Sequence, residues 1–363
     1  MNLARKNIQE ISPYIAGKPI AETKRELGLK KVIKLASNEN PFGASPKAVK
    51  AIKRCLKELN RYPDSNSFYL KRRIASGLRV ITSSIVVGNG SDELIDIILK
   101  TFVEEGENIV TGDTTFLEYD IISRVYARQV VKVPLKDFRF DLARMKEKIN
   151  DKTKLVFIAN PNNPTGTYVT KSELENFLSG LPDNVIVVMD EAYDTFIDVA
   201  DYPNSADYMG KNNIIVLKTF SKAYGLAGLR VGFAVAAEKF TAFMEKARQP
   251  FNVNLLAQEA ALAALDDKAF LNKTRKLVLN GKKYLYAAFE KLEIKYIPSV
   301  TNFILVDLKR DGVAVFKELL KQGVIVRDMQ QYGLKNFVRI TIGTAAENKK
   351  LIAALKKVLQ KPG

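Results

Sequence analysis

The sequence predicts an α/β fold with a large, mostly parallel sheet and a second, smaller α+β domain. Short runs of β-branched and other apolar residues recur between about residues 85 and 235, without the alternation of a half-exposed strand. Such runs suit strands that helices cover on both faces. Beyond about residue 240 long helical segments appear, and alternation is visible over 302–308 and 338–343. This change predicts a second sheet with one face open or lightly covered.

Length and composition agree with that division. The chain has 363 residues, 47% of them hydrophobic, which is enough for one large core and a smaller companion. We expect an arm over 1–30 that belongs to the small domain, a large domain over 31–245 and a small domain over 246–363. The sequence has no apolar run near the roughly 18 residues of a membrane span and no apolar secretory segment at its start. With the single Cys55, these features predict a cytoplasmic protein without a membrane partner.

The absence of histidine narrows the chemistry. No residue of the chain is a histidine, which excludes a Ser-His-Asp triad and a histidine-ligated metal, so we expect no metal site. A general base must then be a lysine, a tyrosine or a carboxylate. The net charge is +17, but the basic residues are scattered and form no block. We therefore expect anionic small molecules as partners and no nucleic acid.

The first 60 residues are predicted to form an arm, a turn and a helix. Prolines and a glycine over 12–19 favour a loop that crosses a surface. Ser45 is the predicted cap of the helix, with Pro46 at its first position. The predicted apolar face of this helix consists of Val49, Ile52, Leu56 and Leu59.

A strand, a glycine-containing loop and a helix follow over 85–102. The loop over 88–93 would present free backbone N–H groups at the start of the helix, which is a site for a phosphate. Ser91 is the candidate cap and phosphate ligand. Alone this signal is weak, because many strand-to-helix turns have the same composition.

Further strands are predicted downstream, and polar motifs directly follow three of them. Ligands collect at the carboxyl ends of the strands in parallel sheets, so these motifs are the candidates for a site. They occupy 160–166, 190–193 and 219–222. The strands are predicted at 108–110, 130–133, 155–159, 185–189, 214–217 and 231–235.

Lys222 is the candidate catalytic residue, because its flanking sequence suits a lysine that forms a Schiff base. An amine reacts with an aldehyde only when it is neutral, and the positive charge of Arg230, eight residues on, would favour the neutral form. The hydroxyls of Thr219 and Ser221 and the guanidinium of Arg230 suit a phosphate ester. One loop could therefore hold both ends of pyridoxal phosphate.

Two other motifs supply what that cofactor needs. Its ring nitrogen requires an acid that keeps it protonated, and its phenolic oxygen requires hydrogen-bond donors. Asp190 is the candidate acid, and Asn163 and Tyr193 are the candidate donors.

The order of these motifs resembles the fold-type I pyridoxal-phosphate-dependent aminotransferases over nearly the whole chain. The motifs are N-P-T-G at 163–166, D-E-A-Y at 190–193 and S-K-x(7)-R at 221–230. The segments 37–43, 61–64, 88–93, 219–232 and 250–254 are similar to the branch that acts on histidinol phosphate. That resemblance implies a large domain with a seven-stranded-type sheet. It also implies transamination between L-histidinol phosphate and 2-oxoglutarate, giving imidazole acetol phosphate and glutamate in histidine biosynthesis.

The resemblance implies several residue roles as well. It implies a homodimer with shared active sites, in which Tyr62 reaches the cofactor phosphate of the neighbouring subunit. Phe116 would stack on the pyridine ring, although Thr114-Thr115 stands where the family usually has a proline ahead of this aromatic residue. Arg339 would clamp the substrate carboxylate. The remaining implied contacts are Gly90, Ser91 and Asp92 for the cofactor, and Tyr14, Asn40, Asn163 and Arg327 for the substrate, with Tyr14 and Arg327 forming a second anion site.

Three other functions are open at this point. An aromatic or broad-range amino-acid aminotransferase would share the fold and the cofactor site. A pyridoxal-phosphate-dependent decarboxylase of a phosphorylated amino acid would share the cofactor site, but Arg339 holding the carboxylate near the ring plane favours proton loss. A non-enzymatic regulator would need a DNA-binding domain before residue 30, and the arm is too short for one.

Overall fold

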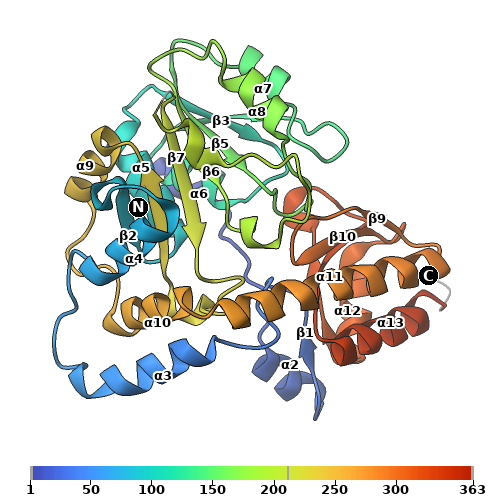
Figure 1. Cartoon of the computed structure of the whole chain (residues 1–363). Helices are drawn as coiled ribbons and strands as arrows, with labels where there is room; N and C mark the ends of the chain where they lie inside the picture. Colours follow the sequence, from blue (N-terminus) through green and yellow to red (C-terminus); the bar gives the residue numbers. More distant parts are fainter. Residues whose placement is uncertain (1–2, 211, 361–363) are drawn as a thin grey trace.

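A seven-stranded sheet forms the centre of the larger unit in the computed structural model, which describes residues 3–210 and 212–360 (Figure 1). The strand order is β2-β8-β7-β6-β5-β3-β4. Strand β8 runs antiparallel to β2 and β7, and the other pairs are parallel. The mostly parallel sheet is therefore confirmed. Its strands are β2 (Ile85–Gly88), β3 (Asn108–Gly112), β4 (Gln129–Val133), β5 (Thr153–Ala159), β6 (Ile186–Asp190), β7 (Ile214–Thr219) and β8 (Gly232–Ala236).

Helices cover both faces of this sheet, as the uninterrupted apolar runs predict. Val86 belongs to the core cluster that contains the apolar face of α5, whereas Ile85 and Val87 belong to the cluster that contains residues of α4 and α10. Successive side chains of one strand therefore pack into two separate hydrophobic cores, one on each face of the sheet. The helices of this unit are α3 (Pro46–Cys55), α4 (Phe68–Leu78), α5 (Ser91–Phe102), α6 (Glu118–Val125), α7 (Leu142–Glu147), α8 (Lys171–Leu178), α9 (Glu238–Ala247) and α10 (Leu255–Leu265).

The C-terminal unit has an antiparallel sheet in the order β12-β13-β10-β9. Of the two predicted arrangements, an open or a lightly covered face, the open face is wrong, because β10 and β13 are buried almost throughout. Leu305 packs in a cluster with Met329 and Tyr332, and Leu117 and Phe138 of the larger unit cover that cluster. The elements are β9 (Lys295–Ile297), β10 (Phe303–Asp307), β11 (Val324–Ile325), β12 (Arg327–Asp328), β13 (Phe337–Thr341), α11 (Lys268–Lys291), α12 (Gly312–Lys321) and α13 (Ala345–Leu359).

The two units are connected across the predicted borders. The short strand β1 (Ile33–Lys34) pairs with β11 of the C-terminal unit, and α10 packs against α3 of the larger one. Helix α11 then runs from α10 along the C-terminal sheet (Figure 1). The domain boundaries at 30 and 245 stay a prediction.

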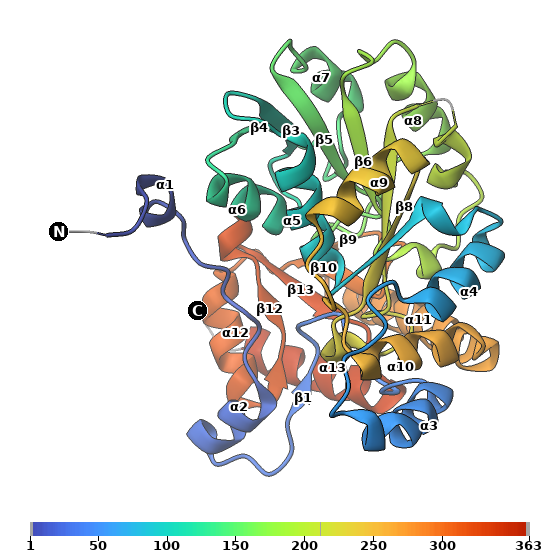
Figure 2. The ribbon, with the colours of Figure 1, turned by 90° about the vertical axis from the view of Figure 1, so that its left-hand side faces the viewer.

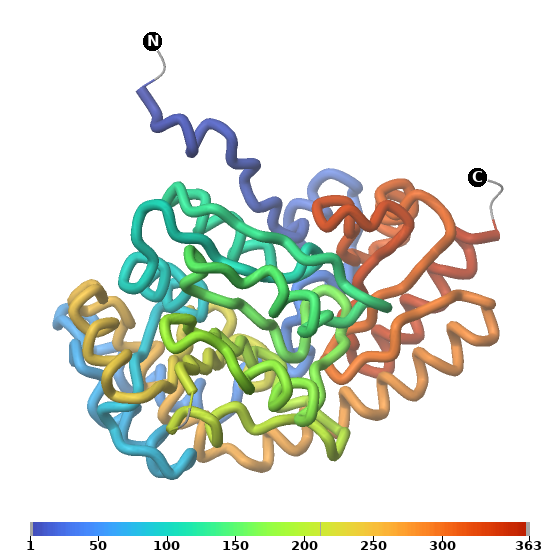
Figure 3. The backbone as a smooth tube through the Cα atoms, turned by 90° about the horizontal axis from the view of Figure 1, so that it is seen from above, coloured from blue at the N-terminus to red at the C-terminus, as the bar shows by residue number. Residues whose placement is uncertain are grey.

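The N-terminal arm begins at the periphery of the molecule and runs along its outside (Figures 2 and 3). It contains α1 (Lys6–Gln9) and α2 (Ile20–Leu27). Side chains of Arg5 and Asn7 donate to the backbone carbonyl of Val125 at the end of α6, at 2.8 and 3.0 Å. The arm is therefore attached at its tip as well as at its base.

Helix α3 begins as predicted but buries a different face. The Ser45 hydroxyl accepts from the Ala48 N–H, and Pro46 is the first helical residue. The buried side chains are Ala48, Ala51 and Cys55, whereas three of the four predicted apolar-face residues, Val49, Leu56 and Leu59, are exposed. The reason is the alanine-rich surface of α10, against which small side chains allow close helix packing.

We expect Ala48→Leu to destabilise the protein, because Ala48 is fully buried against the alanines of α10. Overpacking of this kind costs about 1–3 kcal/mol. Chemical denaturation would measure it, with the exposed Lys50→Leu on the same helix as the control. An equal change in both variants would contradict the proposed packing.

Candidate active site

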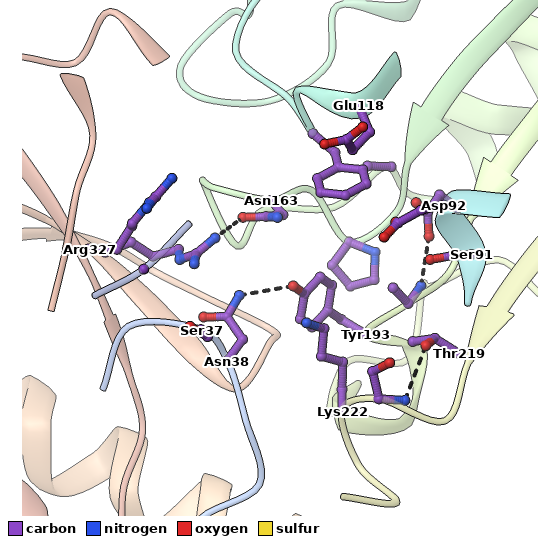
Figure 4. Close-up of a pocket in the computed structure, with 18 of the residues that line it drawn as sticks. Ser37, Asn38, Ser91, Asp92, Glu118, Asn163, Tyr193, Thr219, Lys222 and Arg327 are labelled. Atoms are coloured by element: carbon purple, nitrogen blue, oxygen red, sulfur yellow. Dashed lines mark hydrogen bonds between the residues drawn. The ribbon is translucent and has the colours of Figure 1, made fainter. Parts of the chain in front are cut away.

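A cavity of about 290 Å³ opens where β5, β6 and β7 end, beside the C-terminal unit (Figure 4). Strands β5, β6 and β7 end at Ala159, Asp190 and Thr219, so all three predicted motifs meet there. Most of the predicted site residues line this cavity. They are Tyr14, Ser91, Asp92, Phe116, Asn163, Asp190, Tyr193, Thr219, Ser221, Lys222, Arg230, Arg327 and Arg339.

Hydroxyl, guanidinium and backbone donors form one end of the cavity. Arg230 donates to Asp92 at 3.0 Å and to the Ser221 hydroxyl at 3.4 Å. The predicted cap of α5 is wrong, because Gly90 occupies the N-cap position and Ser91 is the first helical residue. Gly90 has a φ of +87°, and a Cβ there would lie 2.6 Å from the Arg230 guanidinium. Glycine is therefore required where the loop meets this arginine.

Lys222 lies next to the predicted donor from β6. Its Nζ is 5.7 Å from the centre of the Tyr193 ring. The Tyr193 hydroxyl in turn accepts a hydrogen bond of 2.9 Å from the Asn38 amide. The tyrosine is thereby held in one orientation beside the amine.

Asp190 is a buried carboxylate with two donors. The Tyr119 hydroxyl lies 2.7 Å from one oxygen, and the Ala192 N–H lies 3.1 Å from the other. Burial raises the pKa of Asp190 to about 6, although both hydrogen bonds and the charge of Lys222 lower it. Tyr119 keeps its proton and donates it in the hydrogen bond to Asp190, because burial and the charge of Asp190 raise the pKa of Tyr119 well above its usual value. Near neutral pH the site therefore contains a buried negative charge.

Two buried arginines form the side of the cavity toward the C-terminal unit. Arg339 donates to the Asn163 amide oxygen and, at 2.8 Å, to the Ala36 carbonyl. Its buried Nε has no hydrogen-bond partner among the described residues. Arg327 donates to the Ile15 carbonyl of the arm, and its guanidinium lies 5.4 Å from the Tyr14 ring centre.

Three predicted residues do not line the cavity. Gly90 is next to the Arg230 guanidinium but does not itself line the cavity. Asn40 is buried and donates to the Ala223 carbonyl at 2.8 Å and to Thr274 at 3.0 Å, so it braces the lysine loop from outside. Tyr62 is 83% exposed, and its ring stacks on Phe251 at 4.6 Å.

The loop before Phe116 is anchored without the usual proline. The Thr115 hydroxyl donates to Asn162 at 2.8 Å, and the Asn162 amide donates to the Thr114 carbonyl at 3.0 Å. Phe116 lines the cavity and makes an edge contact with Tyr119 at 5.6 Å.

Sequence reasoning missed four polar residues at the site: Ser37, Asn38, Glu118 and Tyr119. Ser37, Asn38 and Glu118 line the cavity, and Tyr119 holds Asp190. Ser37 and Asn38 lie in the polar segment 37–43, where the sequence predicts a site role for Asn40 alone. Glu118 and Tyr119 directly follow the predicted stacking residue, and that proximity was the available signal.

The residues present fit a pyridine ring that carries an aldehyde and a phosphate ester. The donor set at the α5 N-terminus suits the phosphate, and Asp190 suits a protonated ring nitrogen. Lys222 lines the same cavity, with its amine beside Tyr193 (Figure 4). No group of three or more acidic or cysteine residues in the described chain is placed to hold a metal ion.

A mostly parallel sheet with a lysine and an aspartate at adjoining strand ends defines the class of fold-type I transferases. The sequence model of the family "Aminotransferase class I and II" matches residues 30–355, and the chain belongs to this family and is an aminotransferase.

Similar proteins cover almost the whole chain. A histidinol-phosphate aminotransferase of Moorella thermoacetica is 48% identical over 98% of this chain and 92% of its own length. The histidinol-phosphate aminotransferase of Caldicellulosiruptor saccharolyticus is 44% identical over 98% of this chain and 99% of its own length. The crystal structure of histidinol-phosphate aminotransferase from Sinorhizobium meliloti in complex with pyridoxal-5'-phosphate has a TM-score of 0.91 at 28% identity, over 99% of this chain and 98% of that one. Across the described residues, no helix is both long and apolar enough to cross a membrane.

We expect Asp190→Asn to stabilise the cofactor-free protein relative to the wild type as pH rises. The pKa of Asp190 is about 6 when folded, against 3.8 as its ordinary value, so burial of its charge begins to cost stability above about pH 4. The cost is complete above about pH 6 and amounts to roughly 3 kcal/mol.

Urea denaturation between pH 4 and 7 would measure this difference, with the exposed Asp183→Asn as the control for loss of a carboxylate. A difference between Asp190→Asn and wild type that does not change with pH would contradict the raised pKa.

Proposed function

We propose that this chain catalyses transamination between L-histidinol phosphate and 2-oxoglutarate with pyridoxal phosphate, giving imidazole acetol phosphate and glutamate in histidine biosynthesis. The observation that carries the proposal is one cavity with Lys222 and Asp190 on one side and Arg327 and Arg339 on the other. The names of the nearly full-length relatives support the substrate.

Pyridoxal phosphate, when bound, supplies an electron sink for the charge that develops at the substrate Cα. Ser91, Thr219, Ser221 and Arg230 would hold its phosphate. Asp190 would keep a proton on its ring nitrogen, and the Tyr119 hydroxyl fixes the direction of that carboxylate. Phe116 would cover one face of the ring.

Different residues would act at the phenolic oxygen of the cofactor and at the Cα of the substrate. The Asn163 amide oxygen is engaged by Arg339, which leaves its amide N–H groups to donate. Tyr193 has its hydroxyl oriented by Asn38, so its own proton points away from that amide. Lys222 Nζ takes the proton from Cα, because no histidine exists to do so.

The two arginines suit substrates with two kinds of anion. Histidinol phosphate has no α-carboxylate, and its phosphate occupies the corresponding branch of Cα, whereas glutamate and 2-oxoglutarate carry two carboxylates. Arg339 would bind the α-carboxylate of the latter pair, and its unpartnered Nε is a free donor for it. Tyr14 and Arg327 would complete the phosphate site beside Arg339, and a donor with a single α-carboxylate, such as an aromatic amino acid, would not need this second cation.

A homodimer with shared active sites is part of the proposal. Tyr62 and Phe251 form an exposed aromatic pair outside the cavity of their own subunit. The apolar side chains of Leu56, Leu59 and Phe68 are exposed as well. Surfaces of this kind suit burial against a second copy, from which Tyr62 would reach the cofactor phosphate. A cytoplasmic location stays a prediction from the sequence.

We expect Lys222→Ala to lower kcat by a factor of about 10² to 10⁴, because it removes the base that moves the Cα proton. Borohydride treatment should fix the cofactor to the wild-type protein and not to the variant. Steady-state assays and mass spectrometry make the two measurements. Turnover at the wild-type rate in the variant would contradict the proposed role.

We expect Arg327→Ala to weaken histidinol phosphate selectively. Loss of a charge-assisted contact to phosphate lowers kcat/KM by roughly ten- to a hundredfold, and 2-oxoglutarate, which has no phosphate, should be less affected. Measuring the two half-reactions separately provides the test. Lys317→Ala, which removes an exposed cation outside the cavity, is the control. Equal losses for both substrates in Arg327→Ala would remove the phosphate site.

A further inference from the structure

Glu118 is an acidic residue of the cavity that the proposed chemistry does not use. It is the first residue of α6, two positions after Phe116, and it lines the cavity. Of the cavity carboxylates, Asp92 pairs with Arg230 at 3.0 Å, and Asp190 accepts from Tyr119. Glu118 makes no hydrogen bond or ion pair with any described residue. Its side chain is half-buried, and both this burial and the charge of Asp92 raise its pKa.

A helical start alone does not account for this placement. A glutamate in the first turn is favoured by the helix dipole, and an exposed side chain would gain that benefit equally. Glu118 instead faces the cavity next to another carboxylate, which is unfavourable in the free protein. A ligand group that donates a proton or carries positive charge would remove both the desolvation and the repulsion.

The charges of the cavity are separated along its length. Figure 4 shows Arg327 at one side, and Glu118 with Asp92 at the opposite side. Arg339 adds a second cation on the Arg327 side, and only Asp92 contributes as a neighbouring charge to the raised pKa of Glu118. The cavity is thus polarised, with an unpaired carboxylate facing two arginines.

The proposed amino donor has its negative charge at one end and a hydrogen-bond donor at the other, which matches the arrangement of charges in the cavity. In histidinol phosphate the amine-bearing carbon carries a phosphate ester on one branch and an imidazole ring on the other. We propose that Glu118 determines specificity for this ring, accepting a hydrogen bond from a ring N–H while the phosphate lies against the arginines. This inference rests on the proposed function and names the part of the substrate that Glu118 recognises.

Such a contact discriminates between rings of similar size. An imidazole, neutral or protonated, has an N–H to donate, whereas a phenyl ring has none. A phenyl ring in the same place would leave the carboxylate desolvated and unpaired, and sites built on a hydrogen bond reject analogues that lack it. L-Phenylalaninol phosphate keeps the amine and the phosphate and differs only in the ring, so it is the matched probe.

The test compares kcat/KM for L-histidinol phosphate and L-phenylalaninol phosphate in the wild type, Glu118→Gln and Glu118→Leu. The wild type should prefer the imidazole substrate. Glu118→Gln keeps the shape and weakens the acceptor, so the preference should fall about tenfold. Glu118→Leu should reduce it further and improve the use of phenylalaninol phosphate. The half-reaction with glutamate should not become slower in Glu118→Gln, because the γ-carboxylate of glutamate would take the place of the ring and gains nothing from a neighbouring carboxylate.

Asp120→Asn is the matched control, because Asp120 lies on the same helix but pairs with Arg124 and Lys132 outside the cavity. It should leave the ratio of the two substrates unchanged. Calorimetric binding of both phosphates to Lys222→Ala, with and without Glu118→Gln, measures the same preference without turnover. Thermal unfolding confirms that each variant is folded.

The outcomes separate the two proposals. If the wild type uses histidinol phosphate and Glu118→Gln loses activity equally with both phosphates, or loses none, the role of Glu118 is overturned and the proposed function stands. If the wild type does not use histidinol phosphate, the proposed function fails first. A lower ratio in Glu118→Gln without a slower glutamate half-reaction supports the inference.

Discussion

The site depends on a partly buried ion network that connects the ends of β6 and β7. Lys218, at the end of β7, donates at 2.6 Å to Glu191 and also to Asp194, both of which follow β6. Burial lowers the pKa of Lys218, but the two carboxylates outweigh it and raise the pKa above its usual value, so the lysine stays charged. Removing one member of such a network would leave an uncompensated charge, which costs far more than an exposed pair. The network therefore fixes Asp190, next to Glu191, relative to the loop that carries Lys222.

The presence or absence of an ion pair also distinguishes charged residues that stabilise the fold from charged residues that are free to bind a ligand. Lys218, outside the cavity, has two carboxylate partners within the protein. Lys222 and Arg339 face the cavity without an ion pair among the described residues, and Asp190 is satisfied by neutral donors only. Groups left in this state lose water on burial and regain an opposite charge only when ligands enter. The lack of an ion pair is therefore what marks Lys222, Arg339 and Asp190 as groups that bind charged ligands.

The sequence predicted the elements that local pattern controls, and it failed where distant segments meet. The strands and the placement of Asp190 and Lys222 at their ends follow from apolar runs and from the rule for parallel sheets. The hydrogen bonds from Tyr119 to Asp190 and from Asn38 to Tyr193 join residues 71 and 155 positions apart, which no local pattern encodes. The prediction of the buried face of α3 failed for the same reason. Small residues of α3 are buried because they pack against the alanine-rich surface of α10, which is distant in the sequence.

The distance between Lys222 and the arginines is set by how the two units pack, and one close contact controls it. Gly166 ends the motif that begins at Asn163, and its carbonyl accepts from Val300 of the C-terminal unit at 2.9 Å. A Cβ on Gly166, whose φ is +78°, would lie 2.4 Å from the Ser299 hydroxyl oxygen. Any larger residue would separate the loop from the C-terminal unit. Because Asn163 on that loop is held by Arg339, the glycine that allows the units to meet also aligns the cofactor side of the cavity with the anion side.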